Sequence, residues 1–218
     1  MLIGGTLLGL AGDLVSKWAA FRSIAGAPVE VRRDEVLAVL GMGESLTRLL
    51  VPSHAPVRVV PGLLELTLVL NPGAVFGIAS GQRWLFVGFT LIALGAGLWA
   101  FCCWTSARDR SAHLGIALML AGALGNLYDR LMYACVRDFL HPLPGMVFPF
   151  GWRNPLSGSR EVWPYVSNIA DLWLIVGIVL LMAFAWRKGG TPTPRVEPGA
   201  SGNRDEGVAG TQPEPPAQ

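Results

Sequence analysis

The chain contains four long apolar stretches. Long polar segments follow the first and the third stretch, and a short loop joins the second to the third. A membrane-spanning helix needs roughly 20 consecutive apolar residues, and each stretch meets that length. The second one carries no charge and has a tryptophan at each end, as interfacial anchors do. The pattern therefore predicts a mainly α-helical membrane protein with four transmembrane helices, at about 1–21, 84–104, 113–133 and 167–186.

The two polar segments predict structure outside the membrane. In the first, Asp34 to Leu50 has the pattern of an amphipathic helix. Leu64 to Leu68 then alternates apolar and polar positions with period two, and Asn71-Pro72-Gly73 follows as a turn. We expect a small β-sheet on the membrane surface, with Gly77 in a supporting role because glycine adopts backbone geometry that other residues resist. The second polar segment, residues 134–166, is rich in proline, glycine and aromatic residues.

Composition supports a membrane protein and excludes a nucleic-acid-binding one. The chain is 52% hydrophobic and 15% charged, with a mean hydropathy of +0.47 and a net charge of only +2. From residue 189 onward, glycine and proline supply 12 of 30 residues and no aromatic residue occurs. We therefore expect one membrane-embedded domain over residues 1–188 and a disordered tail over 189–218.

The positions of the basic residues predict the orientation. Arg108 and Arg110 lie in a short loop after the second span, and Arg187 and Lys188 follow the fourth. Positive residues in short flanks mark the cytoplasmic side. Both termini are then cytoplasmic, and both polar segments face the opposite, extracytoplasmic side.

Two acids are the candidate catalytic residues. Asp138 follows the third span closely, and Asp171 lies about five residues into the fourth, roughly 7 Å deep at 1.5 Å per residue. Acids at membrane depth are costly and are functional hypotheses by default. Two carboxylates in one site share a proton, so the pair supplies a general base and a general acid. No His-Glu-x-x-His motif is present, and we expect neither a metal nor a cofactor.

The other polar residues of the spans admit structural and functional roles. Asp13 and Lys17 are four residues apart, which favours an ion pair near the membrane surface with Lys17 snorkelling; contact with substrate is the alternative. Asn126 and Asp129 share a helical face and could bond each other, or Asp129 could pair with Arg130. Arg130 could instead meet phosphate or a peptide carbonyl.

Asn168 lies three residues before Asp171 and therefore on the same helical face. It could form a hydrogen bond with that acid, or it could hold the substrate. A small proton-coupled transporter or channel is the competing function, but it calls for acids deep within several spans. A structural scaffold would not need two clusters of the form Asn-x-x-Asp.

Five motifs together resemble one family. They are Asp13-x-x-x-Lys17, Asn71-x-Gly73-x-x-Phe76-Gly77, Gly125-Asn126-x-x-Asp129-Arg130, Val136-x-Asp138-Phe139 and Asn168-x-Ala170-Asp171. In this order they are similar to the motifs of bacterial lipoprotein signal peptidase (signal peptidase II). The resemblance covers residues 13 to 171.

The resemblance implies an aspartyl endopeptidase that cuts prolipoproteins before the diacylglyceryl-modified cysteine. Asp138 and Asp171 would be the catalytic pair. The residues that would line the substrate site, where globomycin also binds, are Asn71, Asn126, Arg130 and Asn168. The resemblance also implies a location in the bacterial inner membrane and a small outer sheet that corresponds to residues 57–80 with part of 142–166. Apart from the resemblance, Phe139 and Trp173 are apolar neighbours of the two acids, and we expect them to border the acyl chains.

Overall fold

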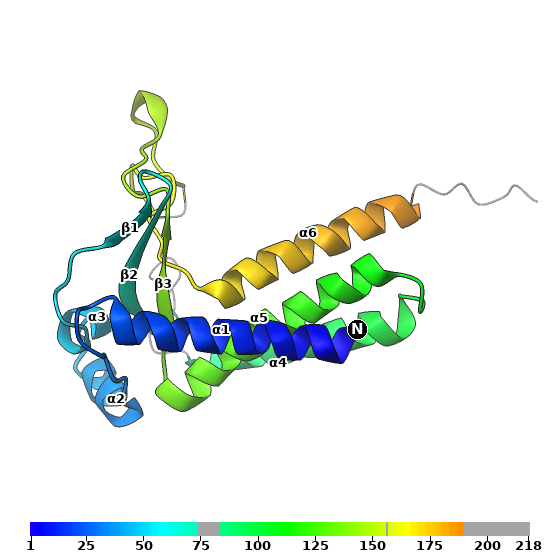
Figure 1. Ribbon diagram of the computed structural model, residues 1–218, viewed down its shortest axis with the longest axis horizontal. Coiled ribbons are helices and arrows are strands. Elements are labelled where there is room, and N and C mark those ends of the chain that lie inside the picture. The colour runs from blue at the N-terminus through cyan, green and yellow to red at the C-terminus, as the bar shows by residue number, and fades with distance from the viewer. Residues whose placement is uncertain (74–82, 156, 190–218) are drawn as a thin grey trace, which may run out of the picture.

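The computed structural model describes residues 1–73, 83–155 and 157–189 (Figure 1). Gly77 and residues 190–218 of the tail lie outside the described residues, so those two expectations stay predictions. Within the described part, the elements in chain order are α1 Leu2–Ser23, α2 Arg33–Gly41, α3 Leu46–Leu50, β1 Val57–Val60, β2 Leu64–Asn71, α4 Arg83–Cys103, α5 Arg110–Tyr133, β3 Val136–Pro142, the 3-10 turn η2 Pro149–Gly151 and α6 Ile169–Gly189.

Three of the helices are long and apolar enough to cross a membrane, namely α4, α5 and α6. Their bounds agree with the spans predicted from the sequence to within a few residues. Helix α1 has 22 residues and therefore the length of a span, but the polar residues Asp13 and Lys17 lower its apolar character. The structure thus confirms a membrane-type helical protein with a small antiparallel sheet.

Helix α5 is the centre of the helical bundle, since it packs against α1, α4 and α6 (Figure 1). Two glycines of α5 allow this close packing. A Cβ at Gly122 would collide with the backbone oxygen of Ala170 at the start of α6, and a Cβ at Gly125 would collide with Asp13 Oδ2 of α1. The bundle is therefore tightest beside the motif residues of α1, α5 and α6.

We expect Gly125→Ala to destabilise the protein by about 1–3 kcal/mol, the usual cost of adding a methyl group to a filled core. The added Cβ would displace the carboxylate of Asp13 from its buried position. The measurement is the thermal unfolding midpoint in detergent. Gly12→Ala in α1 is the matched control, because a Cβ there has no neighbouring atom within 4 Å. Equal midpoints for both variants would contradict this packing.

The three strands form one antiparallel sheet in the order β1-β2-β3 at one end of the bundle (Figure 1). The third strand is Val136–Pro142, and an isolated bridge joins Val147 to Glu161 farther along the chain. Residues 74–80 of the expected sheet lie outside the described residues, so its full extent stays a prediction. Strand β3 follows α5 after only two residues, one of them Ala134 in the left-handed conformation with φ 62°. This sharp turn places Asp138 on the sheet and directly beside the bundle.

One side of the sheet is covered by α2 and α3. Their apolar residues Val36, Val39 and Leu46 are buried with Leu68 of β2 and Phe139 of β3. The sequence predicted one amphipathic helix over 34–50, but the structure has two, because the chain turns through Gly43 at φ +72°. Phe139 belongs to this core, so its expected place beside acyl chains is wrong.

Candidate functional site

Asp138 and Asp171 line one cavity of about 330 Å³ at the junction of sheet and bundle. Asp138 comes from the middle of β3 and is only 2% exposed, whereas Asp171 lies in the first turn of α6 and is half-buried. The two acids therefore lie at one cavity, as the sequence predicted. The lining comprises Asn71, Asn126, Arg130, Val136, Asp138, Asn154, Val162, Trp163, Tyr165, Val166, Ser167 and Asp171.

The start of α6 explains the spacing of Asn168 and Asp171. Asn168 Oδ1 accepts a hydrogen bond from the backbone N–H of Asp171 at 3.1 Å, and Asp171 Oδ2 accepts one from the backbone N–H of Asn168 at 3.3 Å. This reciprocal arrangement is a capping box, which satisfies two N–H groups at a helix start. It also directs the carboxylate of Asp171 into the cavity, where the positive end of the helix dipole favours its charge.

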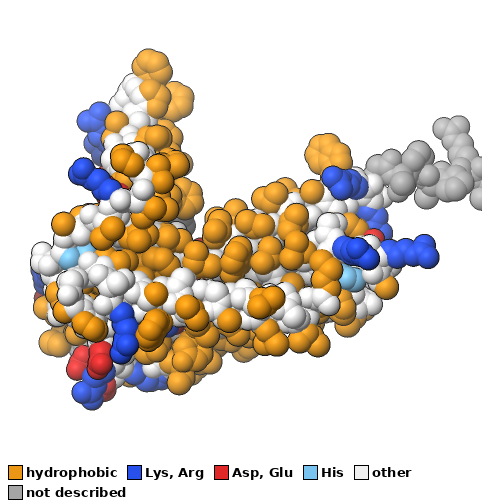
Figure 2. Space-filling model, viewed as in Figure 1, with side chains coloured by type: hydrophobic (Ala, Val, Ile, Leu, Met, Phe, Trp, Pro, Cys, Tyr) orange, Lys and Arg blue, Asp and Glu red, His pale blue; other side chains and the backbone are white. Residues whose placement is uncertain are grey.

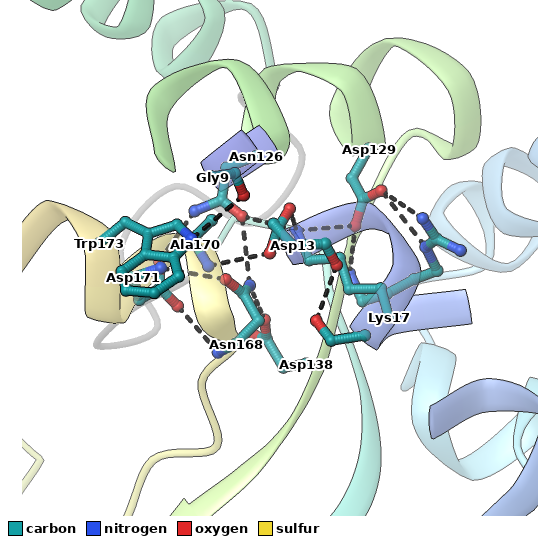
Figure 3. Close-up of polar contacts among 12 residues, drawn as sticks. Gly9, Asp13, Lys17, Asn126, Asp129, Asp138, Asn168, Ala170, Asp171 and Trp173 are labelled. Carbon is teal, nitrogen blue, oxygen red and sulfur yellow. Dashed lines mark hydrogen bonds and ion pairs between the residues drawn. The ribbon is translucent and has the colours of Figure 1, made fainter. Parts of the chain in front are cut away.

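Three asparagine side chains hold the two acids, and Figure 3 labels two of them, Asn126 and Asn168. Asn168 Nδ2 donates to Asp138 Oδ1 at 2.6 Å and to Asn126 Oδ1 at 3.2 Å. Asn126 Nδ2 in turn donates to Asp171 Oδ1 at 2.8 Å, and Asn71 Nδ2 donates to Asp138 Oδ2 at 3.1 Å. Each acid thus keeps a fixed orientation, and Asn168 touches both.

The orientation of Asn71 follows from the sheet register and the turn after β2. Asn71 pairs with Val136, and Val69 pairs with Asp138, so Asn71 extends past Asp138 on the neighbouring strand. Its Oδ1 accepts from the backbone N–H of Gly73 at 2.9 Å, which leaves Nδ2 for the acid. Gly73 adopts φ +103°, a conformation that favours glycine.

Asp13 and Lys17 form the expected ion pair at 2.9 Å, but both side chains are fully buried, so the expectation that Lys17 snorkels is wrong. Asp13 Oδ1 accepts from the backbone N–H of Ala170 at 2.8 Å and so caps α6 from a different helix. Lys17 Nζ donates to Asn126 Oδ1 at 3.1 Å. The pair therefore orients the residues that hold the acids (Figure 3).

Asp129 is bound by Arg137, a residue that the sequence analysis did not single out. Its carboxylate accepts from the Arg137 guanidinium at 2.8 and 3.2 Å and from the Arg137 backbone N–H at 3.0 Å, and it lies 3.3 Å from Lys17 Nζ. Neither Asn126 nor Arg130, the two expected partners, contacts it in the hydrogen bonds of the described residues. The alternation of side chains along β3 was the available signal, because it turns Arg137 away from Asp138.

Arg130 lies at the cavity and keeps hydrogen-bonding capacity free. Its guanidinium donates to the backbone oxygen of Asn126 at 3.2 Å and lies 5.2 Å from the ring centre of Phe86. Its buried Nε has no hydrogen-bond partner among the described residues. The positive charge interacts with the carboxylates of Asp171 and Asp138. Arg130 is thus placed to meet a polar group that enters beside the acids.

Burial and, after it, the nearby charge of Asp171 raise the pKa of Asp138 from its ordinary value to about 7, against the lowering effect of the hydrogen bonds from Asn71 and Asn168. Below about pH 7, Asp138 therefore keeps its proton. One ionised and one protonated carboxyl group are what general acid–base chemistry needs.

Comparison with known proteins identifies relatives over most of the chain. The model of the signal peptidase (SPase) II family matches residues 6–187. A lipoprotein signal peptidase from Desulfitobacterium hafniense is 35% identical over 149 residues, which are 68% of this chain and 82% of the relative. One from Bifidobacterium longum is 32% identical over 181 residues, which are 78% of this chain and 81% of the relative.

Two solved structures, each described as a bacterial membrane enzyme, share the fold. One has a TM-score of 0.58 at 22% identity and covers 84% of this chain and 90% of its own. The other has a TM-score of 0.56 at 22% identity and covers 95% and 93%. The fold and the family match over residues 6–187 agree, and the chain belongs to the signal peptidase II family.

Proposed function

We propose that this chain removes signal peptides from prolipoproteins as an aspartic endopeptidase, with Asp138 and Asp171 as its catalytic residues. The observation that carries the proposal is that Asn168 donates to both carboxyl groups, from its side chain to Asp138 and from its backbone N–H to Asp171, and so fixes them at one cavity. Its relatives are lipoprotein signal peptidases, and none of these comparisons supports transport. The clustering of the acids at one end of the bundle also argues against an ion path through it.

In the proposed reaction, the ionised carboxyl group of the pair takes a proton from water while the water oxygen attacks the scissile carbonyl carbon. The protonated carboxyl group donates its proton to the leaving amine as the C–N bond breaks. Arg130 lines the cavity beside the acids, which suits its guanidinium to bind a carbonyl oxygen of the substrate peptide. Asn71, Asn126 and Asn168 then serve as the groups that hold the acids and border the substrate.

We further propose that α1 is the fourth span, which makes the peptidase domain residues 1–188. Its charged residues Asp13 and Lys17 are buried against the bundle, so its remaining surface is free to face lipid. The N-terminus, the α4–α5 loop and the end of α6 lie at one end of the bundle, where Figure 2 shows a group of basic side chains. That end is cytoplasmic by the positive-inside rule, and the sheet and acids face outward.

The substrate lipid has a suitable place next to the acids. A mainly apolar cavity of about 490 Å³ adjoins the first one and shares Asp171, Trp163 and Ser167 with it. The acyl chains of a diacylglyceryl cysteine, and the antibiotic globomycin, are the proposed occupants of the joined cavities. Trp173, the other expected neighbour of acyl chains, instead donates to the backbone oxygen of Gly9 at 3.1 Å inside the bundle.

The test compares cleavage of a diacylated and an unmodified prolipoprotein by the purified enzyme in micelles, each with and without EDTA. We expect strong preference for the diacylated precursor, because each buried methylene contributes about 0.8 kcal/mol to anchoring at the depth of the acids. We expect EDTA to have no effect, since the two acids suffice. Equal rates on both precursors would exclude the lipid site, and activity that EDTA removes and zinc restores would exclude the acid pair.

A further inference from the structure

A hairpin arm, defined here as residues 143–166 without residue 156, extends sideways from the sheet at the end of the spans (Figure 1). Its two sides are joined by backbone hydrogen bonds from Phe148 to Arg160 at 2.9 Å and from Val162 to Met146 at 2.8 Å. Five residues of the described arm line the candidate cavity, namely Asn154, Val162, Trp163, Tyr165 and Val166, and Phe150 and Trp152 are not among them. The outer part of the arm therefore has no role in the chemistry proposed above.

The tip of the arm presents large apolar side chains to its surroundings. Phe150 is 93% exposed and Trp152 is 69% exposed, and Met146 and Val147 are exposed beside them. Phe150 adopts φ 59°, a left-handed conformation that bulky residues rarely take. Backbone strain of this kind marks functional positions, and here it turns an aromatic ring outward.

The arm has an apolar side and a basic side. Figure 2 shows hydrophobic side chains on the side that faces along the spans, whereas Lys and Arg side chains lie on the opposite side. The basic residues of the described arm are Arg153 and Arg160, both exposed. The apolar side also continues at its base into the apolar cavity along α6, through Trp163. An apolar side turned toward the bilayer, with aromatic residues at its tip, matches the interfacial region of a membrane.

We propose that this arm inserts Phe150 and Trp152 into the outer leaflet of the membrane and so anchors the sheet beside the acids. The proposal rests on the membrane placement given under Proposed function, and it concerns lipid rather than a protein partner. Arg153 and Arg160 stay in water or at the headgroups. The arm then fixes the sheet, and with it Asp138, relative to the lipid-anchored substrate.

Site-specific fluorescence in lipid nanodiscs tests the proposal with the full chain. Phe150→Cys and Trp152→Cys are introduced with Cys102→Ser and Cys103→Ser, and each new cysteine is labelled with NBD. Cys135 remains, because burial raises the pKa of its thiol to about 12 and it carries almost no reactive thiolate. Arg160→Cys is the matched control on the basic side of the same arm.

In phosphatidylcholine–phosphatidylglycerol nanodiscs we expect the NBD emission at positions 150 and 152 to be blue-shifted. A lipid carrying a spin label should quench most of the emission intensity at these two positions. Position 160 should keep water-like emission and little quenching. Thermal unfolding of each labelled protein verifies the fold. Equal, water-like emission at all three positions would overturn the proposal, whether or not the protein cleaves prolipoproteins. Lipid quenching at 150 and 152 in a protein without cleavage activity would leave the arm's role intact and refute only the proposed reaction.

Discussion

Asp138→Asn and Asp171→Asn should each lower the cleavage rate of a diacylated prolipoprotein by roughly 100- to 10,000-fold. Each amide removes one titratable group from a pair that works as a unit, so the double variant should be little slower than either single one. Among the described residues that line the cavity, no other carboxyl group is present to take over. A gel-shift assay at equal amounts of folded enzyme gives the rates.

The fold of these variants can be tested separately. The folded-state pKa of Asp138 is raised to about 7, so its contribution to stability is present at low pH and is lost as the pH rises through that value. At pH 8, Asp138→Asn should therefore unfold at the same temperature as the wild type or at a higher one. Asp34→Asn, which changes an exposed acid of α2, is the matched control and should retain full activity. Appreciable turnover by either single variant at the catalytic pair would remove that residue from the pair.

Lys17→Met should produce the largest loss of stability, on the order of 3–5 kcal/mol, because it leaves buried carboxylates without their cation. Lys17 Nζ lies 2.9 Å from Asp13 and 3.3 Å from Asp129, and all three side chains are fully buried. Its loss also frees Asn126, whose amide then no longer has a fixed orientation toward Asp171. We expect a lower unfolding midpoint in detergent together with slower cleavage.

The chain offers one matched control for this substitution, since Lys188 is its only other lysine. Lys188 is exposed at the end of α6 and donates to the backbone oxygen of Trp104 at 2.8 Å. Lys188→Met should change the unfolding midpoint and the cleavage rate little. Similar losses in the two variants would mean that the buried position of Lys17 has no special importance.

The helices and the position of Asp138 and Asp171 at one cavity could be predicted because their signals are local. Runs of apolar residues predict the long helices to within a few residues. The two acids at the edge of such runs are conspicuous, because a charge at membrane depth is energetically costly. The capping box of Asn168 and Asp171 is likewise readable, since it needs only a spacing of three.

The partners of the buried charges could not be predicted because they come from distant segments. The spacing of Asp13 and Lys17 indicated a pair, but only the packing of α1 against α5 and α6 buries it and directs Asp13 to Ala170. The bond between Asp129 and Arg137 depends on the sharp turn at Ala134. Local spacing favoured Arg130 for that role, and the tertiary structure placed Arg130 at the cavity instead.

The dependence of kcat/KM on pH tests most directly whether one proton is shared between the two acids. Because the pKa of Asp138 is raised to about 7, the pair keeps its proton below that pH and loses it above. We expect cleavage of the diacylated precursor to fall about tenfold per pH unit above neutrality, as the general acid is lost. Return to pH 6 should restore the rate. A rate that rises from pH 7 to 9, as for a nucleophile activated by losing a proton, would contradict the shared proton and with it the aspartic mechanism.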